Sequence, residues 1–394
     1  MTRTNKSSFR WSSAALAPVA LVALSLSACS GGDDGERPEQ TTEYVWALPP
    51  GFPVPAVPEE NPMSAAKAEL GRHLFYDQRL SLNGTQSCAS CHRQELAFTD
   101  GLAHAVGSTG VVNRRSSMSL ANAAYNSAQT WANPVLKTLE MQVAVPLLGD
   151  DPVELGFSGQ ELELLDRLHD EPRYIEMFAA AFPDDPADPV NLYNLVRAIA
   201  SFERRLISGN SPYDAYTSGR DPEAISESAQ RGAQLFFGER FECHHCHGSF
   251  ALSTSVTWQG KSSVQISYQN DALYNLDGEG AYPPRDQGLF EITGRPEDMG
   301  KFRPPTLRNV AVTAPYMHDG SIATLREVIE QHYARGGRVI EDGDDAGDGA
   351  LSPRKAVFVS GFAIEPREVD DLLAFLESLT DESFLTDPSL SDPW

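Results

Sequence analysis

Two five-residue segments of the chain share the pattern Cys-x-x-Cys-His, one at positions 88–92 and the other at positions 243–247. In this pattern two thiols bond to the edge of a porphyrin and the adjacent imidazole reaches its iron, so each copy signals covalent attachment of a c-type haem. Together the two copies use every cysteine beyond position 29. The predicted haem-attachment and iron-binding residues are Cys88, Cys91, His92, Cys243, Cys246 and His247.

Two other kinds of site use paired cysteines. Zinc sites built from two Cys-x-x-Cys pairs place those pairs much closer together than the about 155 residues that separate these copies. A thioredoxin-like dithiol does not need the histidine that follows each pair. The sequence therefore predicts two covalently bound c-type haems.

Residues 1–29 have the features of a bacterial lipoprotein signal peptide. A positively charged start is followed by an apolar run over 14–26 that is too short for a comfortable transmembrane span. The Leu-Ser-Ala-Cys segment resembles a lipobox, in which Cys29 becomes the lipidated first residue; an ordinary signal peptide that leaves Cys29 as a free thiol is the alternative. Because bacteria attach c-type haem outside the cytoplasm, we expect the protein on the periplasmic side of the cell envelope. No Asp follows Cys29, which favours the outer membrane for the lipid anchor.

The chain is strongly acidic. Its formal net charge is −24, and removal of the three basic residues of the signal segment, with no acidic residue before Asp33, takes the charge to −27. This charge promotes solubility and disfavours nucleic acid and anionic lipid surfaces as partners. We therefore expect no nucleic-acid partner and membrane contact through the N-terminal lipid only. A basic electron donor, or a basic patch on a client protein, suits the charge.

Helical periodicity dominates after residue 60, and alternating strand-like runs are scarce. Long loops rich in Gly, Pro, Asn and Ser cover 208–224, 251–305 and 336–353, where a haem could supply the missing core. The predicted helices cover residues 64–74, 160–168, 174–182, 190–207, 226–237 and 368–379.

A weak internal repeat indicates two related halves. Residues 69–75 precede the first haem motif as residues 230–237 precede the second, so in each half an amphipathic helix runs into Cys-x-x-Cys-His. We predict an all-α fold of two cytochrome c-like domains with long loops, each domain carrying one covalent haem. The expected divisions are a lipoprotein signal peptide at 1–29, a flexible linker at 30–60, an N-terminal domain at 61–210 and a C-terminal domain at 211–394.

Several segments resemble the bacterial di-haem cytochrome c peroxidase and MauG-like family. The similarity runs from about residue 60 to 385 and includes Arg-Pro-Pro-Thr-Leu-Arg-Asn-Val at 303–310 and Thr-Ala-Pro-Tyr-Met-His-Asp-Gly at 313–320. Thr-Trp-Ala-Asn-Pro at 130–134 and Pro-Val-Glu-Leu-Gly at 152–156 are more narrowly similar to the MbnH-type enzymes found with methanobactin and copper-homeostasis genes.

The resemblance implies an enzyme that uses hydrogen peroxide to form a high-valent di-haem state. That state would oxidise a side chain, by expectation a tryptophan, on a partner protein such as a periplasmic copper-binding protein. One alternative is a di-haem cytochrome c peroxidase that reduces hydrogen peroxide with electrons from a small cytochrome or cupredoxin. A non-catalytic electron-transfer cytochrome is the third reading.

The first haem iron is expected to keep its far face open. Classical members place a distal histidine there, and gap-free alignment from Asp100 through Gly107 puts Ser108 at that position. Serine is a poor iron ligand, so the resemblance implies a five-coordinate iron on His92. His104 is the alternative sixth ligand, and its binding would imply a need for reductive activation.

Peroxide cleavage needs a base that takes a proton and an acid that returns it. The resemblance places a glutamine and a glutamate over the first haem at Gln142 and Glu154, with Pro146 in the pocket between them. A buried carboxyl near iron can hold a raised pKa, which suits a proton shuttle. A solvated loop carboxylate is the alternative for Glu154. The catalytic groups predicted from the resemblance are Gln142, Glu154 and Trp131.

Trp131 matches the family tryptophan that lies between the two haems. An indole at that place can relay an electron by hopping across a gap too wide for comfortable direct transfer. An ordinary core tryptophan is the alternative. The other tryptophans of the mature chain, at 46, 258 and 394, have no such placement.

The sixth ligand of the second haem iron has two candidates. Relatives use a Met or a Tyr fourteen residues after the His of a Pro-Tyr-x-His turn, and that count from His318 gives His332. The local sequence, His-Tyr followed by Gly-Gly, instead favours Tyr333 with one residue inserted before it. Because Thr324 and Glu327 form a capping box that fixes the helix start, the insertion requires a π-bulge. Tyr333 is the preferred iron ligand and His332 the alternate.

A calcium ion between the domains is a further expectation from the resemblance. Thr313 and Pro315 match positions whose backbone carbonyls are ligands. The usual third contributor is an Asn after Arg, whereas here Arg115 is followed by Ser116, so the calcium site stays open. The acidic run at 341–348 lacks EF-hand spacing and is interpreted as a solvated loop.

Overall fold

The structure is a computed structural model that describes residues 44–394 except Gln265. The predicted signal peptide at 1–29, its Cys29, and residues 30–43 lie outside the described residues, so the prediction of lipidation is not tested. Within the described range, no helix has both the length and the apolar character needed to cross a bilayer.

The described chain is helical, which confirms the helical fold class, and it carries a two-stranded antiparallel sheet of β1 (Val339–Ile340) and β2 (Gly347–Asp348). The α-helices are α1 (Ala65–Tyr76), α2 (Cys88–Cys91), α3 (Leu139–Leu148), α4 (Glu161–His169), α5 (Pro172–Ala181), α6 (Leu192–Glu203), α7 (Pro212–Thr217), α8 (Glu227–Phe236), α9 (His244–His247), α10 (Phe290–Thr293), α11 (Leu325–Glu327), α12 (Pro366–Glu377) and α13 (Glu382–Leu385). Short 3₁₀ turns lie at Gln78–Leu80, Gln94–Leu96, Ala123–Tyr125, Pro296–Asp298, Val310–Val312 and Gly349–Leu351, and a π-helix at Val328–Tyr333.

The six helices predicted from periodicity are present as α1, α4, α5, α6, α8 and α12, with ends displaced by a few residues. Periodicity did not predict α3, because the apolar residues of this helix are spread over all its sides instead of forming one stripe. The short helix α7 lies inside a segment expected to be loop. It forms because Ser211 and Asp214 make a capping box around Pro212 at the first helical position.

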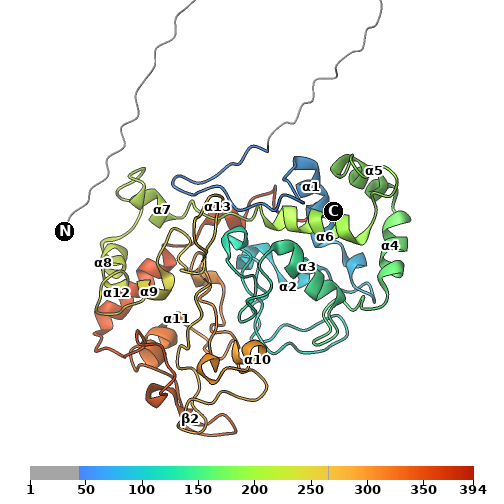
Figure 1. Ribbon diagram of the computed structural model, residues 1–394. Coiled ribbons are helices and arrows are strands. Elements are labelled where there is room, and N and C mark those ends of the chain that lie inside the picture. The colour runs from blue at the N-terminus through green and yellow to red at the C-terminus, as the bar shows by residue number, and fades with distance from the viewer. Residues whose placement is uncertain (1–43, 265) are drawn as a thin grey trace, which may run out of the picture. The chain divides into compact units, whose positions relative to one another are not determined.

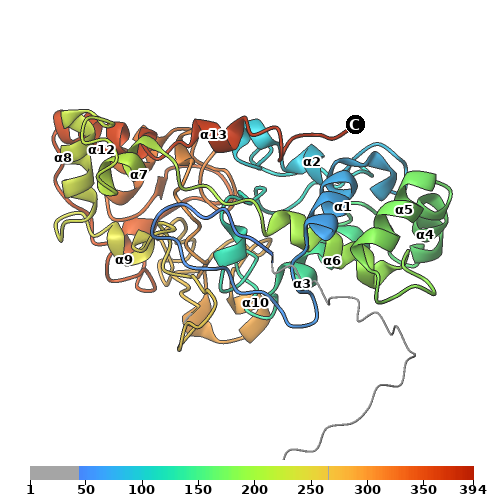
Figure 2. The same cartoon turned by 90° about the horizontal axis from the view of Figure 1, so that it is seen from above.

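Two pairs of packed helices lie at opposite ends of the folded protein. In Figures 1 and 2, α1 runs beside α6, while α8 runs beside α12 at the opposite end from α4 and α5. A glycine stands at the crossing point of each pair. A Cβ built on Gly71 would lie 1.9 Å from the carbonyl oxygen of Ala198, and one on Gly232 would lie 1.9 Å from that of Asp371. The internal repeat therefore has a structural cause, since both halves need a backbone approach that only glycine permits.

Replacing Gly71 or Gly232 by alanine is expected to lower the free energy of unfolding by about 1–3 kcal/mol, because the added methyl group would overpack the crossing. Helix propensity alone would have the opposite sign and would favour alanine by up to about 1 kcal/mol. Thermal unfolding of the holoprotein decides between the two effects. An unchanged or raised Tm in either variant would contradict the close crossing.

The buried apolar residues of the described chain gather in separate clusters. The first is built mainly on α1 and α3 to α6, and the second on α8 and α12. The chain end returns to the first cluster, where Phe384, Leu385 and Leu390 are buried. Trp394 packs against His73, with ring centroids 5.2 Å apart. The predicted division at residue 210 stays a prediction.

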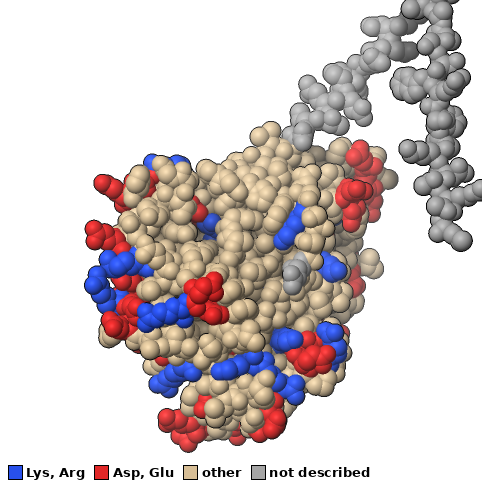
Figure 3. Space-filling model, turned by 60° about the vertical axis from the view of Figure 1, so that its left-hand side comes forward, with Lys and Arg blue, Asp and Glu red and all other residues tan. Residues whose placement is uncertain are grey.

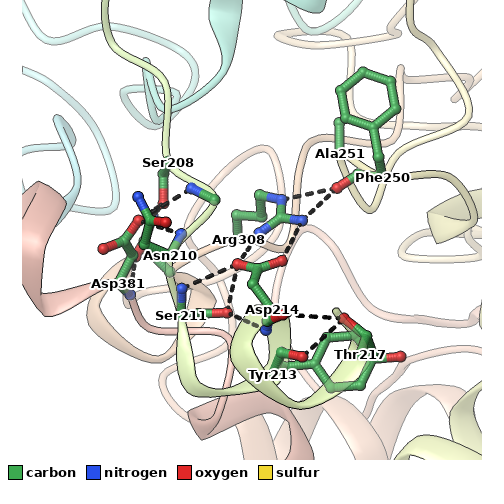
Figure 4. Close-up of polar contacts among 12 residues, drawn as sticks. Ser208, Asn210, Ser211, Tyr213, Asp214, Thr217, Phe250, Ala251, Arg308 and Asp381 are labelled. Carbon is green, nitrogen blue, oxygen red and sulfur yellow. Dashed lines mark hydrogen bonds and ion pairs between the residues drawn. The ribbon is translucent and has the colours of Figure 1, made fainter. Parts of the chain in front are cut away.

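Buried polar contacts hold the segment near residue 210 in place (Figure 4). Arg308 donates to both carboxylate oxygens of Asp214, at 2.7 and 2.9 Å, and to the carbonyl oxygen of Phe250. Burial alone would raise the pKa of Asp214, but the hydrogen bond and charge of Arg308 lower it overall. The carboxylate of Asp381 accepts from the backbone N–H of Asn210 at 2.9 Å. This connection is therefore fixed to distant parts of the chain.

Candidate active site

A cavity of about 280 Å³ opens beside the first Cys-x-x-Cys-His segment. Cys88, Cys91 and His92 line it, together with residues of α3 and of the loop that follows. Nδ1 of His92 lies 2.7 Å from the carbonyl oxygen of Phe98, which leaves Nε2 to bind iron. Cys88 and Cys91 are not joined by a disulfide. The residues at this cavity fit a covalently attached haem.

A second cavity, of about 250 Å³, is lined by Cys243, Cys246 and His247. Nδ1 of His247 is 3.2 Å from the carbonyl oxygen of Leu252, so this ring is also held by one nitrogen. The two motifs therefore have the same local arrangement.

Arg303 gives a further test of fit at the second cavity, which it lines. The guanidinium is fully buried, and burial lowers its pKa to about 10. Within the described residues no carboxylate forms an ion pair with it; it donates to the carbonyl oxygen of Thr130 and the amide oxygen of Asn126, each at 3.2 Å, and to the sulfur of Met118 at 3.7 Å. A buried cation needs a compensating anion, and the propionates of a haem would supply one.

Gln142, Pro146 and Glu154 all line the first cavity, so the structure brings the predicted acid–base groups together. Leu155 donates its backbone N–H to the carbonyl oxygen of Pro146 at 2.9 Å, which folds the loop after α3 back onto that helix. The amide oxygen of Gln142 is buried and has no hydrogen-bond partner among the residues that the structure describes. An orphaned acceptor at a cavity wall is expected to meet a donor that the cavity holds.

Burial raises the pKa of the Glu154 carboxyl, and a weak hydrogen bond from Asn113, at 3.4 Å, partly opposes the shift. The loop around Gly107 holds the Glu154 backbone, because both the N–H and the hydroxyl of Ser108 donate to the Glu154 carbonyl oxygen at 2.7 Å. A Cβ on Gly107 would lie 2.1 Å from the carbonyl oxygen of Val153. Close backbone approach therefore presents the glutamate to the cavity.

His104, the alternative sixth ligand of the first iron, is not among the described residues that line the first cavity, and neither is Ser108, which stands at the position of the distal histidine. The Ser108 hydroxyl is engaged with the Glu154 backbone. Burial lowers the pKa of His318, and His104 lies near enough to add a smaller effect in the same direction. The arrangement is compatible with an open far face, which stays a prediction.

Trp131 lines both cavities. Its Nε1 donates to the carbonyl oxygen of Ser116 at 3.0 Å, and its own carbonyl oxygen accepts from the backbone N–H of Arg303 at 2.7 Å. The indole is thus held between the two predicted haem sites. The electron-relay role is not tested by this placement.

The segment that carries the two alternative ligands is a π-helix, Val328–Tyr333, and Thr324 and Glu327 form the capping box before it. The expected π-bulge is therefore present. Tyr333 lines the second cavity, whereas His332 does not. Burial lowers the pKa of His332 to about 4, and a contact with the Asp271 backbone opposes this shift in part. The π-helix thus favours Tyr333 over His332 as the ligand.

Replacing Tyr333 by phenylalanine is expected to change the second haem of the holoprotein from low-spin to high-spin, because the variant removes the phenol oxygen that is predicted to be the sixth ligand of the iron. His332→Phe, which changes the adjacent buried ring, is the matched control and should leave the spin state unchanged. Low-temperature EPR of the ferric protein measures both. The reverse pattern would assign the iron ligand to His332.

Thr313 and Pro315 line the second cavity together with Ser116. The two predicted calcium ligands and Ser116, which stands where relatives have an Asn, are therefore near one another. Whether a calcium ion binds among them stays a prediction.

Sequence reasoning missed Glu203, which lines the first cavity from the end of α6 and is only 7% exposed. Burial raises the pKa of Glu203 to about 8; the charge of Arg204 lowers it and that of Glu140 raises it. The signal was available, since Glu203 falls on the face of α6 that carries Leu195 and Phe202. A carboxyl on an apolar helix face is a candidate functional group.

Comparison with known proteins agrees with this arrangement. Residues 65–222 match the family profile described as "Di-haem cytochrome c peroxidase". Cytochrome-c peroxidase IdrP1 of Pseudomonas sp. (strain SCT) is 33% identical over 362 residues, which cover 88% of this chain and 88% of the relative. Methylamine utilization protein MauG of Methylorubrum extorquens is 31% identical over 325 residues, covering 82% of this chain and 81% of the relative.

The crystal structure of a MauG-like protein associated with microbial copper homeostasis superposes with a TM-score of 0.87 at 48% identity, covering 89% of this chain and 99% of that one. The fold is thus MauG-like. The chain belongs to the di-haem cytochrome c peroxidase and MauG family, and it is a di-haem peroxidase-type oxidoreductase.

Proposed function

We propose that the protein uses hydrogen peroxide to oxidise a side chain, by expectation a tryptophan, on a partner copper-binding protein of the periplasm. Two c-type haems, one at each cavity, would supply the redox chemistry by accepting the two oxidising equivalents of peroxide and passing them on. The observation that carries this proposal is the position of Trp131, which lines both cavities. Such a shared residue suits an enzyme in which both sites act together.

The chain's own groups have distinct tasks at the first cavity. The carboxylate of Glu154 takes a proton from peroxide and returns it to the departing oxygen, as its burial and raised pKa permit. The orphaned amide oxygen of Gln142 accepts a hydrogen bond and orients the peroxide. Ser108 keeps the glutamate in place through the Glu154 backbone.

The choice of partner rests on the 48% identity to the MauG-like protein associated with copper homeostasis. On the face shown in Figure 3, acidic and basic side chains lie in small mixed groups with a broad uncharged area between them. That face therefore has no large patch of one sign, and a partner that docks there would be recognised mainly by shape and by uncharged contacts.

The proposal is tested by incubating the holoprotein with hydrogen peroxide and a purified copper-binding candidate partner, followed by mass spectrometry of the partner. Addition of oxygen to a tryptophan, dependent on peroxide and on the holoprotein, is the expected result. The competing function is favoured by the identity to IdrP1 and predicts instead rapid turnover with a reduced small cytochrome or cupredoxin. Fast turnover with such a donor, without any modified partner, would contradict the proposal.

We further propose that the mature protein is anchored by lipid at Cys29 on the periplasmic side of the outer membrane and binds calcium through Thr313 and Pro315. The lipobox-like sequence supports the anchor, and the shared position at the second cavity supports the calcium site. Cys29→Ser should release the protein from the membrane fraction. Elemental analysis of the holoprotein should find one calcium per chain.

A further inference from the structure

We propose that Glu239, His244 and His245 form a binding site for a divalent transition-metal ion, with Cu²⁺ as the preferred occupant. The two histidines occupy the variable positions of the second Cys-x-x-Cys-His motif, and Glu239 lies in the turn before them. One ligand atom from each residue lies within 4.8 Å of the other two. None of the three lines the second cavity, so the site is separate from the one predicted to hold haem.

The distances suit a metal ion. The two carboxylate oxygens of Glu239 lie 3.5 Å from Nε2 of His244 and 3.3 Å from Nε2 of His245. Bonds of about 2.0–2.2 Å put neighbouring ligand atoms about 2.8–3.1 Å apart in the square-planar arrangement that Cu²⁺ prefers, and about 3.3–3.6 Å apart in a tetrahedral one. Glu242 places a further carboxylate oxygen 3.7 Å from Nε2 of His245. Small side-chain movements would therefore seat an ion on these three protein ligands, while Glu242, which also lines the second cavity, lies beside the site.

The two imidazoles are held in place before an ion arrives. The His245 ring stacks on Phe358, with ring centroids 4.1 Å apart and ring planes at 11° to each other. The centroid of the His244 ring lies 4.2 Å from that of the His245 ring. Nδ1 of His244 is buried and accepts or donates no hydrogen bond within the described part of the chain, so no competing bond there fixes this ring in another orientation. The histidine side chains are 23% and 28% exposed and that of Glu239 is 78% exposed, which leaves a route from solvent.

The chemistry of the three groups selects the kind of ion. Imidazole nitrogens with a carboxylate oxygen suit zinc and copper, and at a given nitrogen and oxygen site Cu²⁺ binds more tightly than Zn²⁺. Without an ion, these contacts are exposed pairs of little energetic value. The site would hold copper within the haem-attachment segment itself, since His244 directly follows Cys243.

The first motif shows how to remove the ligands without losing the motif, because it carries Ala89 and Ser90 at the equivalent variable positions. His244→Ala combined with His245→Ser therefore recreates a sequence that this chain already uses. Glu239→Gln lies outside the motif and tests the site independently, so a failure of haem attachment in the double variant does not prevent a decision.

The experiment is a competition titration of chelator-treated full-length holoprotein with Cu²⁺ alone, followed by EPR of the bound copper. Wild type is expected to bind one Cu²⁺ at this site with nitrogen coupling from imidazole, and Zn²⁺ should be displaced by Cu²⁺. The double variant and Glu239→Gln should each lose affinity by about tenfold or more. His169→Ala, at an exposed histidine near Asp188, should bind copper as wild type does. Unchanged affinity in the double variant and in Glu239→Gln, or copper without imidazole coupling, would overturn the proposal.

Discussion

Replacing Glu154 by glutamine is expected to slow the reaction of the holoprotein with hydrogen peroxide by about 100-fold or more, because an amide cannot accept the peroxide proton. The substitution keeps the size of the side chain and the hydrogen bonds that Ser108 makes to the Glu154 backbone. Stopped-flow absorbance after mixing with peroxide measures the rate. Asp150→Asn removes an exposed carboxylate from the same loop and is the matched control, for which no loss of rate is expected.

The pH dependence follows from the same group. The ionised carboxylate is the reactive form, and burial places the pKa of Glu154 above its ordinary value of 4.5. The rate for wild type should therefore rise with pH through this raised pKa, and Glu154→Gln should lose that rise. If Glu154→Gln reacts at the rate of wild type, the glutamate has no acid–base role.

Replacing Trp131 by phenylalanine is expected to lower the rate of partner oxidation by about tenfold or more, which corresponds to about 1.4 kcal/mol on the barrier. Phenylalanine keeps an aromatic ring at the place shared by the two cavities, but it is much harder to oxidise than an indole and cannot donate to the Ser116 carbonyl oxygen. The initial reaction with peroxide should change little, because Glu154 and Gln142 are untouched. The split between these two rates is the signature of a relay.

Trp258→Phe is the matched control for this experiment. Trp258 packs against Phe250, with ring centroids 6.0 Å apart, and is not among the described residues that line either cavity. Both rates should stay at the wild-type level in this variant. Equal losses in Trp131→Phe and Trp258→Phe would mean that tryptophan packing, and no relay, explains the effect.

Local patterns predicted much of the helical framework. The amphipathic stripes of α4, α5, α8 and α12 were readable because each of these helices buries one face. The helix α3 lacked such a stripe, although it carries Gln142 and Pro146 to the first cavity. The close helix crossings at Gly71 and Gly232 were also hidden, because the repeat showed where the glycines stand without showing what they approach.

The site residues differed in how far sequence could locate them. The Cys-x-x-Cys-His spacing is local and could be recognised directly. The capping box fixed the start of the helix, so an extra residue before Tyr333 implied the π-helix that the structure contains. Gln142 and Glu154 came from family resemblance, because their proximity depends on a loop that folds back onto α3. Glu203 was missed since its importance arises from burial at a cavity that is formed by several distant segments.

The first haem site is expected to keep an open far face, where peroxide can meet Glu154. Low-temperature EPR of the resting ferric holoprotein tests this most directly. One high-spin signal together with one low-spin signal is the predicted result. Two low-spin signals would contradict the account, because a protein side chain such as His104 would then already occupy the place where peroxide must bind.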